Sequence, residues 1–227
     1  MINKIVASIA DALADIKDGS TVLVGGFGAA GQPLQLIDGL IEQGAKDLTI
    51  VANNAGSGRA GLARLLDLGR VRKVVCSFPR SSDPVVFETL YRAGKLELEI
   101  VPQGTIAERL RAAGAGIPAF FTPTSAGTKL AEGKRVETIS GVECVLEMAL
   151  PGDVALIEAW QADRWGNLTY RRAGRNFNPV MAMAAKKTIA QSQHVVELGE
   201  IDPETVITPG VFVDRVVHVP HGDPPGF

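Results

Sequence analysis

The sequence predicts an α/β fold: a single domain with a mainly parallel sheet flanked by helices, and some antiparallel strands in its second half. Along the first half, short runs of β-branched and aliphatic residues alternate with segments whose apolar residues follow helical spacing. This alternation is typical of parallel strands joined by right-handed helical crossovers. No repeat or long linker divides the 227 residues, and 46% of them are hydrophobic, which suffices for one large core.

Glycine, proline and capping signals delimit the elements of the first half. Segment 34–43 shows the reasoning, because its apolar residues share one helical face and Gly44 follows as a C-terminal cap. The same reasoning predicts helices over 4–16, 34–43, 61–68, 83–91 and 106–113. Strands are predicted over 22–24, 48–52, 71–76 and 96–101.

The second half of the chain has a different pattern. Segment 114–133 is rich in glycine, proline and threonine, which predicts an ordered functional loop. Antiparallel strands are expected over 135–150. Further predicted elements are a strand over 154–160, a turn over 163–167 into residues 168–170, a helix over 180–190, and strands over 195–198 and 211–213. We expect the domain to span residues 1–218, followed by a Pro/Gly-rich tail over 219–227.

Composition and charge exclude several classes of function. The formal net charge is -2 with acidic and basic residues mixed, so we expect no binding to nucleic acid or to a membrane. No apolar run reaches the ~18 residues of a spanning helix, and no signal segment is recognised at the N-terminus. Cys76 and Cys144 fit no metal or redox spacing, so we expect buried reduced thiols in a cytoplasmic protein. The histidines do not cluster with acids, so no metal site is expected.

A glycine-rich turn at residues 25–31 is the most informative stretch for function. It lies between the predicted strand 22–24 and the predicted helix 34–43, where Pro33 favours a helix start. Its glycines allow positive φ angles or a close approach of the backbone to a ligand. Free N–H groups in such a turn and at a helix start bind anions. We therefore expect an anion-binding site here.

The turn also contains the spacing G-x-G-x-x-G from Gly26 to Gly31, which is a dinucleotide-binding fingerprint. A dinucleotide site needs a carboxylate at the end of the second strand to bind ribose hydroxyls, whereas this sequence has the neutral pair Asn53 and Asn54 there. An NAD-binding dehydrogenase domain is thus the less favoured alternative. The phosphate-binding loop of NTPases is also excluded, because no Gly-Lys-Ser/Thr follows the turn. A non-catalytic binding module and a turn that only packs strand against helix stay open.

Further motifs are spread over nearly the whole chain. They are Gly25-Gly26-Phe27-Gly28 with Gly31 and Pro33, Asn53-Asn54-Ala55-Gly56, Pro102-Gln103-Gly104-Thr105 with Ala107-Glu108-Arg109, Gly114-Ala115-Gly116-Ile117-Pro118-Ala119-Phe120, Gly166-Asn167 and Arg175-Asn176-Phe177-Asn178. Together they resemble the A (alpha) subunit of family I coenzyme A transferases. Within that family, Cys76-Ser77-Phe78-Pro79-Arg80 and the helix start from Met181 to Ala185 are most similar to the enzymes that act on 3-oxoadipate. The succinyl-CoA:3-ketoacid transferases form the rival subfamily.

The resemblance implies a reaction and a partner. In the family, a glutamate carboxylate attacks an acyl-CoA thioester and gives an acyl–glutamyl anhydride, then a glutamyl-CoA thioester. That glutamate lies in a Ser-Glu-Asn-Gly-like motif of a second subunit, and this chain has no such motif. We therefore expect no catalytic residue in this chain, and a partner B subunit that supplies the nucleophile in a heterodimer or heterotetramer. CoA, carried by succinyl-CoA, is implied as a substrate, with no tightly bound cofactor.

The resemblance also implies binding residues. It places CoA contacts on Gly25, Gly26, Phe27, Gly28, Ala29, Ala30 and Gly31. Gln103 is a candidate for orienting a substrate carboxylate, because its amide donates a hydrogen bond without adding a charge; the alternative is a side chain that pins its own turn. Asn53 and Asn54 either hold the loop beside the site or cap the strand end through the backbone.

Arg80 is the residue expected to separate the two subfamilies. The acid 3-oxoadipate has a second carboxylate, which acetoacetate lacks. A guanidinium at the end of the third strand would bind that group in a two-pronged geometry. We expect Arg80, assisted by Ser81 or Ser82, to select 3-oxoadipate; the alternative is an arginine exposed in a loop. The expected reaction transfers CoA from succinyl-CoA to 3-oxoadipate in bacterial breakdown of aromatic compounds, with acetoacetate as the alternative acceptor.

Overall fold

The structure is a computed structural model that describes residues 2–220. Its main sheet has nine strands in the order β1-β12-β11-β9-β2-β3-β4-β5, and β10 pairs with β9 outside this path. The strands are β1 (Ile5–Val6), β2 (Thr21–Val24), β3 (Leu48–Val51), β4 (Val71–Cys76), β5 (Glu97–Ile100), β9 (Gly152–Ala162), β10 (Leu168–Thr169), β11 (Ala185–Val195) and β12 (Arg215–His218). Among these strands, only β10 is antiparallel to its neighbour. The predicted α/β class is confirmed; residues 221–227 of the predicted tail lie outside the described residues.

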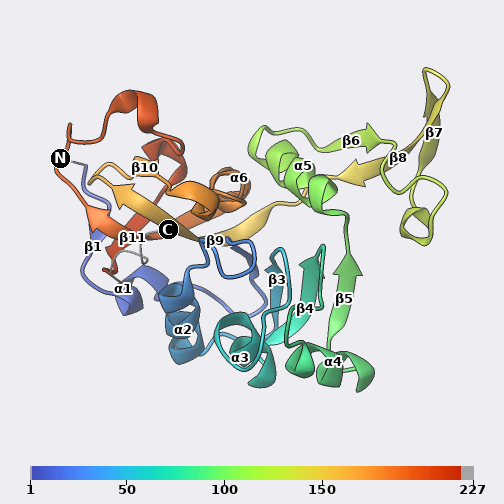
Figure 1. Cartoon of the computed structure of the whole chain (residues 1–227), viewed down its shortest axis with the longest axis horizontal. Helices are drawn as coiled ribbons and strands as arrows, with labels where there is room; N and C mark the ends of the chain where they lie inside the picture. Colours follow the sequence, from blue (N-terminus) through green and yellow to red (C-terminus); the bar gives the residue numbers. More distant parts are fainter. Residues whose placement is uncertain (1, 221–227) are drawn as a thin grey trace.

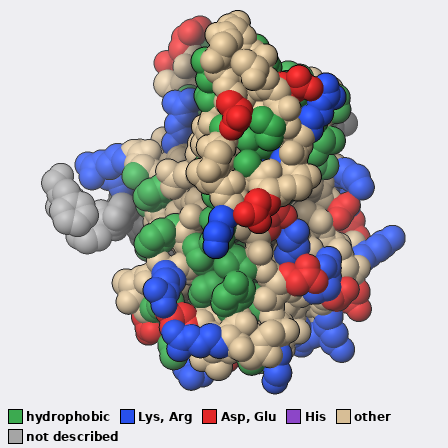
Figure 2. Space-filling view, turned by 90° about the vertical axis from the view of Figure 1, so that its right-hand side faces the viewer, with side chains coloured by type: hydrophobic (Ala, Val, Ile, Leu, Met, Phe, Trp, Pro, Cys, Tyr) green, Lys and Arg blue, Asp and Glu red, His purple; other side chains and the backbone are tan. Residues whose placement is uncertain are grey.

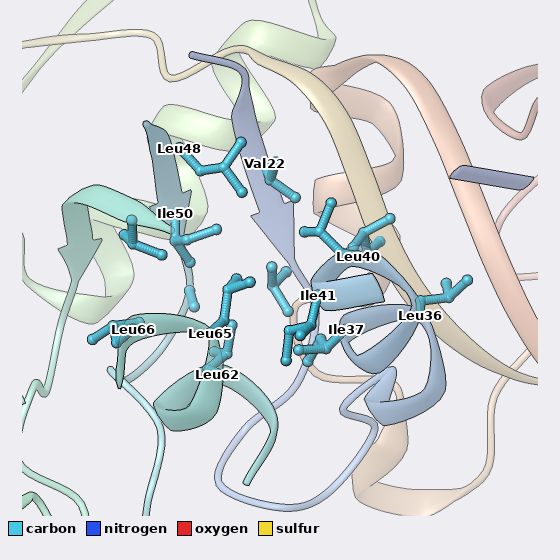
Figure 3. Close-up of a cluster of buried hydrophobic side chains, with 14 of the residues drawn as sticks. Val22, Leu36, Ile37, Leu40, Ile41, Leu48, Ile50, Leu62, Leu65 and Leu66 are labelled. Carbon is cyan, nitrogen blue, oxygen red and sulfur yellow. The ribbon is translucent and has the colours of Figure 1, made fainter. Parts of the chain in front are cut away.

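Helices cover both faces of this sheet (Figure 1). They are α1 (Ile9–Leu13), α2 (Leu34–Gln43), α3 (Gly61–Asp67), α4 (Val85–Arg92), α5 (Gln103–Gly114) and α6 (Asn178–Ala184). Helices α1 to α4 share one core with Val22 and Val24 of β2, whereas α5 and α6 share the other with Leu23. Successive residues of a strand point to opposite faces, so β2 contributes to both cores. Figure 3 shows leucines and isoleucines of α2 and α3 gathered beside Val22 and Ile50.

A second, antiparallel sheet lies outside the main body. It consists of β6 (Ala119–Thr122), β8 (Val142–Met148) and β7 (Val136–Ile139), in that order. We call residues 119–148 the arm, which extends to one side of the molecule in Figure 1. Ile139, Val142 and Met148 are exposed, and Figure 2, which views the molecule from that side, shows hydrophobic surface among the charged side chains. The predicted antiparallel strands are confirmed, and β6 adds a strand to the segment predicted as a loop.

The buried side chain of Arg109 on α5 joins the arm to the main sheet. Arg109 donates from Nη1 to Oε1 of Glu99 on β5 (2.9 Å) and from Nε to the carbonyl of Met148 on the arm (2.7 Å). Lys73 on β4 donates to the other oxygen of Glu99 (2.6 Å). Burial alone would raise the pKa of Glu99, but the hydrogen bonds from Lys73 and Arg109 outweigh it and lower that pKa. Helix α5 is therefore tied to both sheets, and its first residue is Gln103.

The helix predicted over 4–16 is too long at both ends, since α1 spans only Ile9–Leu13. Helix α1 begins only at Ile9, because Ser8 caps it by accepting a hydrogen bond from the N–H of Asp11 (3.0 Å). Residues 5–6 instead form β1, which pairs with β12. The serine N-cap was the local signal for the true start.

Three predicted elements near the C-terminus also differ from the structure. The helix predicted over 180–190 stops where α6 ends, and the chain continues as β11 between β9 and β12. Pairing on both sides overrides the local helical spacing. Strand β11 ends at the start of the segment predicted over 195–198. The strand predicted over 211–213 is a 3-10 turn, and the strand there is β12.

The main core gives a direct test of the packing on α3. Leu65 is fully buried, whereas Leu68 at the end of the same helix is 51% exposed. We expect Leu65→Ala to lower the free energy of unfolding by about 2–5 kcal/mol, because it leaves a cavity. Leu68→Ala should change it by less than about 0.5 kcal/mol. Urea unfolding followed by circular dichroism measures both, and equal losses would contradict this assignment of the core.

Candidate functional site

The glycine turn leaves β2 and doubles back on itself. Phe27 and Ala30 exchange two backbone hydrogen bonds, with N···O distances of 3.0 and 3.1 Å, so Gly28 and Ala29 form the tip of a two-residue hairpin. Gly28 has a φ of 61°, the positive value that the first central residue of a type II′ turn requires. No described residue accepts a hydrogen bond from the backbone N–H of Gly28 or Ala29. These two N–H groups are free to bind an anion.

The tip of the turn borders a cleft of about 840 Å³. The other walls come from the carboxyl ends of β3, β4 and β5, because neighbouring parallel strands bring the loops that follow them together. The lining residues are Phe27, Gly28, Ala29, Gln32, Leu34, Asn53, Asn54, Gly56, Ser57, Ala60, Ser77, Phe78, Ser81, Ser82 and Gln103. None of these side chains is charged, so the cleft offers an anion neutral hydrogen-bond donors.

Three of the lining residues form a hydrogen-bond network across the ends of β3, β4 and β5. Oδ1 of Asn53 accepts from Oγ of Ser77 (2.9 Å) and from Nε2 of Gln103 (2.8 Å). Asn53 is 7% exposed, so its amide has one orientation imposed by two donors. Asn54 has a local role, since its Oδ1 accepts from the N–H of Gly56 (2.8 Å) and shapes the loop. The network fixes which atom of Gln103 faces Asn53.

The structure brings part of the predicted binding set together in the cleft. The predicted residues that line it are Phe27, Gly28, Ala29, Asn53 and Gln103. The predicted residues that do not line it are Gly25, Gly26, Ala30, Gly31 and Arg80. The turn therefore presents its tip to the cleft and keeps its two ends behind the tip.

Arg80 lies outside the cleft. Its Nη2 is 2.6 Å from Oε1 of Glu88 on α4, and 63% of its side chain is exposed. It borders a separate hollow that also includes Tyr91. The predicted helpers Ser81 and Ser82 do line the cleft. To take the predicted role, the guanidinium would have to exchange Glu88 for a substrate carboxylate.

Sequence reasoning did not single out Ser57, Ser77 or Phe78 as site residues. Ser77 and Phe78 directly follow β4, and the rule that ligands bind at the carboxyl ends of parallel strands was the signal for them. Ser57 reaches the site through the loop after β3, where its Oγ lies 3.1 Å from that of Ser82, and no spacing in the sequence indicates this. Phe27 and Phe78 are 50% and 62% exposed, so the cleft presents aromatic surface to a ligand.

Comparisons with known proteins identify the family of this chain. Residues 6–219 match the family model described as "Coenzyme A transferase". This chain belongs to the coenzyme A transferase family. It is 66% identical over 219 residues to the A subunit of 3-oxoadipate CoA-transferase from Pseudomonas putida, covering 96% of this chain and 95% of the relative. It is 48% identical over 214 residues to the A subunit of a probable succinyl-CoA:3-ketoacid coenzyme A transferase from Bacillus subtilis (strain 168), covering 94% and 89%.

Solved structures of coenzyme A transferases share the fold. Glutaconate coenzyme A-transferase from Acidaminococcus fermentans superposes with a TM-score of 0.85 at 25% identity, covering 96% of this chain and 76% of that one. An acyl-CoA transferase from E. coli O157:H7, solved as a thioester complex with CoA, gives 0.83 at 22% identity. That match covers 98% of this chain but only 48% of the other, so this chain spans about half of that transferase. Nothing in these comparisons supports the dehydrogenase alternative.

Two further features of residues 2–220 bear on the site. None of their helices is both long and apolar enough to cross a membrane. Across the same residues, no three His, Cys, Asp or Glu side chains gather in a way that could hold a metal ion.

Cys76 is the last residue of β4 and precedes Ser77 of the cleft, but its thiol is unreactive. The residue is fully buried, and this burial raises the pKa of the thiol to about 12, which a backbone hydrogen bond with Phe78 only partly offsets. The thiolate is the nucleophilic form of cysteine, so Cys76 is inert near neutral pH.

We expect Cys76 to resist alkylation in the folded protein. In a Cys144→Ser variant, labelling by iodoacetamide should stay slow from about pH 8 to pH 10, because the folded thiol keeps its proton over that range. Unfolded Cys76, with an ordinary pKa near ~8.5, should be labelled rapidly and faster as the pH rises. Intact mass spectrometry follows the reaction. Rapid labelling of the folded variant near pH 8 would contradict the raised pKa.

Proposed function

We propose that this chain is the A subunit of a cytoplasmic enzyme that transfers CoA from succinyl-CoA to 3-oxoadipate, and that a partner B subunit supplies the glutamate nucleophile. The observation that carries the proposal is the 66% identity to the P. putida protein over 96% of this chain. The cleft adds a chemical argument, since its lining residues include donors for an anion but no carboxylate. A nucleophile delivered by the partner completes such a site.

The proposed reaction has two symmetrical halves. The partner's glutamate attacks the thioester carbonyl of succinyl-CoA, and the C–S bond breaks to give an acyl–glutamyl anhydride and CoA thiolate. The thiolate attacks the glutamyl carbonyl, which releases succinate and leaves a glutamyl-CoA thioester. The carboxylate of 3-oxoadipate then displaces CoA in the same way, and CoA thiolate attacks the acyl carbonyl of the new anhydride. This last attack releases 3-oxoadipyl-CoA and regenerates the carboxylate of the partner's glutamate side chain.

This chain would bind and orient the reacting groups. Each attack creates an oxyanion, which preorganised N–H donors stabilise. The free N–H groups of Gly28 and Ala29 supply such donors for an oxyanion or for a phosphate of CoA. Gln103 would orient the carboxylate of the acid, and Asn53 would hold Gln103 by accepting from its Nε2. The exposed ring of Phe78 would contact the apolar part of the thioester.

A second candidate acceptor is acetoacetate. The 48% identity to the B. subtilis protein, whose name describes a 3-ketoacid transferase, favours it. The two acceptors use the same chemistry, and 3-oxoadipate carries one additional carboxymethyl group, so the choice between them concerns specificity contacts alone.

The origin of the nucleophile can be tested by trapping. The enzyme assembled from this chain and its B subunit is incubated with succinyl-CoA and then reduced with borohydride, which converts a glutamyl thioester to an alcohol. Peptide mass spectrometry should find the modified glutamate in the B subunit, and only when succinyl-CoA is present. A modified glutamate in this chain, for example at Glu158, would overturn the division of labour between the subunits.

The role of Arg80 as a selector of the dicarboxylate also stays a proposal, and the chain offers a matched control. Arg80 and Arg92 both pair with Glu88, at 2.6 and 2.8 Å, but only Arg80 adjoins the loop that lines the cleft. In the assembled enzyme, Arg80→Ala should lower kcat/KM for 3-oxoadipate by about tenfold or more relative to acetoacetate, because a charge-assisted pair is lost. Arg92→Ala should leave the ratio unchanged. Equal losses on both acids would refute the selector role.

A further inference from the structure

Two asparagines from the last third of the chain hold the glycine turn from behind. Oδ1 of Asn176 accepts from the N–H of Gly26 (3.0 Å), and its Nδ2 donates to the carbonyl of Ala30 (3.0 Å). Nδ2 of Asn178 donates to the carbonyl of Gly31 (3.0 Å). These three bonds bind both ends of the turn and leave its tip untouched. They cross about 150 residues of sequence.

The asparagines are themselves held in place. Asn178 is fully buried, and its Oδ1 accepts from the backbone N–H of Glu158 on β9 (3.0 Å). Its Nδ2 also donates to the carbonyl of Gly174 (2.8 Å). Nδ2 of Asn176 donates to the carbonyl of Ala173 as well (2.7 Å). Each carboxamide therefore has its orientation fixed by groups on both sides, which makes the pair a rigid support rather than a mobile contact.

Two glycines of the turn lie where a side chain would collide with the asparagines. A Cβ at Gly25 would lie 1.8 Å from Oδ1 of Asn178. A Cβ at Gly31 would lie 2.8 Å from Nδ2 of Asn176 and 2.9 Å from Nδ2 of Asn178. A Cβ at Gly28 would meet nothing within 4 Å. Asn178 therefore occupies the space of a side chain at Gly25, and the two asparagines together with the carbonyl of Gly174 (2.4 Å from such a Cβ) occupy that space at Gly31, whereas Gly28 lies at the open tip.

We propose that Asn176 and Asn178 are positioning residues that set the conformation of the turn, so that the N–H groups of Gly28 and Ala29 stay free for the CoA thioester. The inference rests on the proposed function for the identity of the ligand. Within the turn, the N–H of Gly26 donates to Asn176, and the N–H groups of Phe27 and Ala30 donate to each other's carbonyls. Those of Gly28 and Ala29 at the tip have no acceptor among the described residues. Preorganised donors of this kind bind an anion without a rearrangement at the moment of reaction.

Hydrogen exchange tests the support without reference to activity. In the assembled wild-type enzyme, the amide of Gly26, bound to Asn176, should exchange at least about tenfold more slowly than the amides of Gly28 and Ala29. Asn176→Ala should speed exchange at Gly26 by about tenfold. Fragmentation mass spectrometry resolves these amides. Equal exchange at Gly26 and Gly28 in the wild type, or unchanged exchange in the variant, would overturn the proposal.

Kinetics test the consequence, with Asn167 as the matched control. Asn167 also joins two segments, since its Oδ1 accepts from the N–H of Gly210 (2.9 Å) and its Nδ2 donates to Asp163 (2.8 Å), but it does not contact the turn. Both Asn176→Ala and Asn167→Ala should lower the melting temperature. Only Asn176→Ala should raise KM for succinyl-CoA, by about tenfold. A wild-type KM in folded Asn176→Ala enzyme, or the same rise in Asn167→Ala, would refute the positioning role.

The two proposals fail in different ways. A wild-type enzyme that transfers no CoA from succinyl-CoA to any acid would refute the proposed function, and the exchange data would still decide the role of the asparagines. If the wild-type enzyme is active but Asn176→Ala changes neither exchange at Gly26 nor KM for succinyl-CoA, the positioning role alone is refuted.

Discussion

The contact between Asn178 and Gly25 is the constraint on which the site depends. Asn178 fills the space where a Cβ of Gly25 would stand, and its Oδ1 bonds to β9 at the N–H of Glu158. Gly25 in turn donates its N–H to the carbonyl of Leu156 on the same strand (2.9 Å). The turn, β9 and the first residue of α6 thus form one hydrogen-bonded unit. Because buried groups set this geometry, the conformation of the turn is set before any ligand arrives.

A cleft of neutral donors suits a reaction whose participants are all anions. Succinyl-CoA, the acceptor acid and an attacking carboxylate each carry negative charge, and the charge on the carbonyl oxygen grows only in the transition state. A lysine or arginine in the cleft would bind the ground-state acids as well, which does not raise kcat. Backbone N–H groups and side-chain amides stabilise the developing charge of the transition state but bind the ground-state acids less tightly than a cation would. Around the cleft, Arg80 and Arg109 are paired with Glu88 and Glu99.

Local pattern predicts most of this fold, and apart from the missed Ser8 cap of α1 its failures lie where distant segments meet. Strand β2, helix α2 and the loops at the ends of β3 and β4 follow from periodicity, glycine positions and the geometry of parallel sheets. Residues 185–190 form a strand because β9 and β12 flank them, which no short window records. The direction of Arg80 depends on Glu88, and the clamp on Gly26 depends on Asn176, about 150 residues away. In these places the structure is determined by contacts between segments rather than by local propensities.

The dinucleotide-like spacing of the turn has causes within the protein itself. In G-x-G-x-x-G a glycine marks a position where the backbone takes a positive φ or lacks room for a side chain. At Gly28 the cause is the positive φ at the tip of the hairpin, and at Gly26 a Cβ would lie 3.1 Å from Cα of Gln32. A Cβ at Gly31 would meet the two asparagines and the carbonyl of Gly174. Asn53 follows β3, and its side-chain Oδ1 accepts hydrogen bonds from Ser77 and Gln103. This position therefore offers no carboxylate to bind the hydroxyls of a ribose. The spacing therefore reflects backbone conformation at Gly28 and packing at Gly26 and Gly31, so it does not by itself identify a ligand.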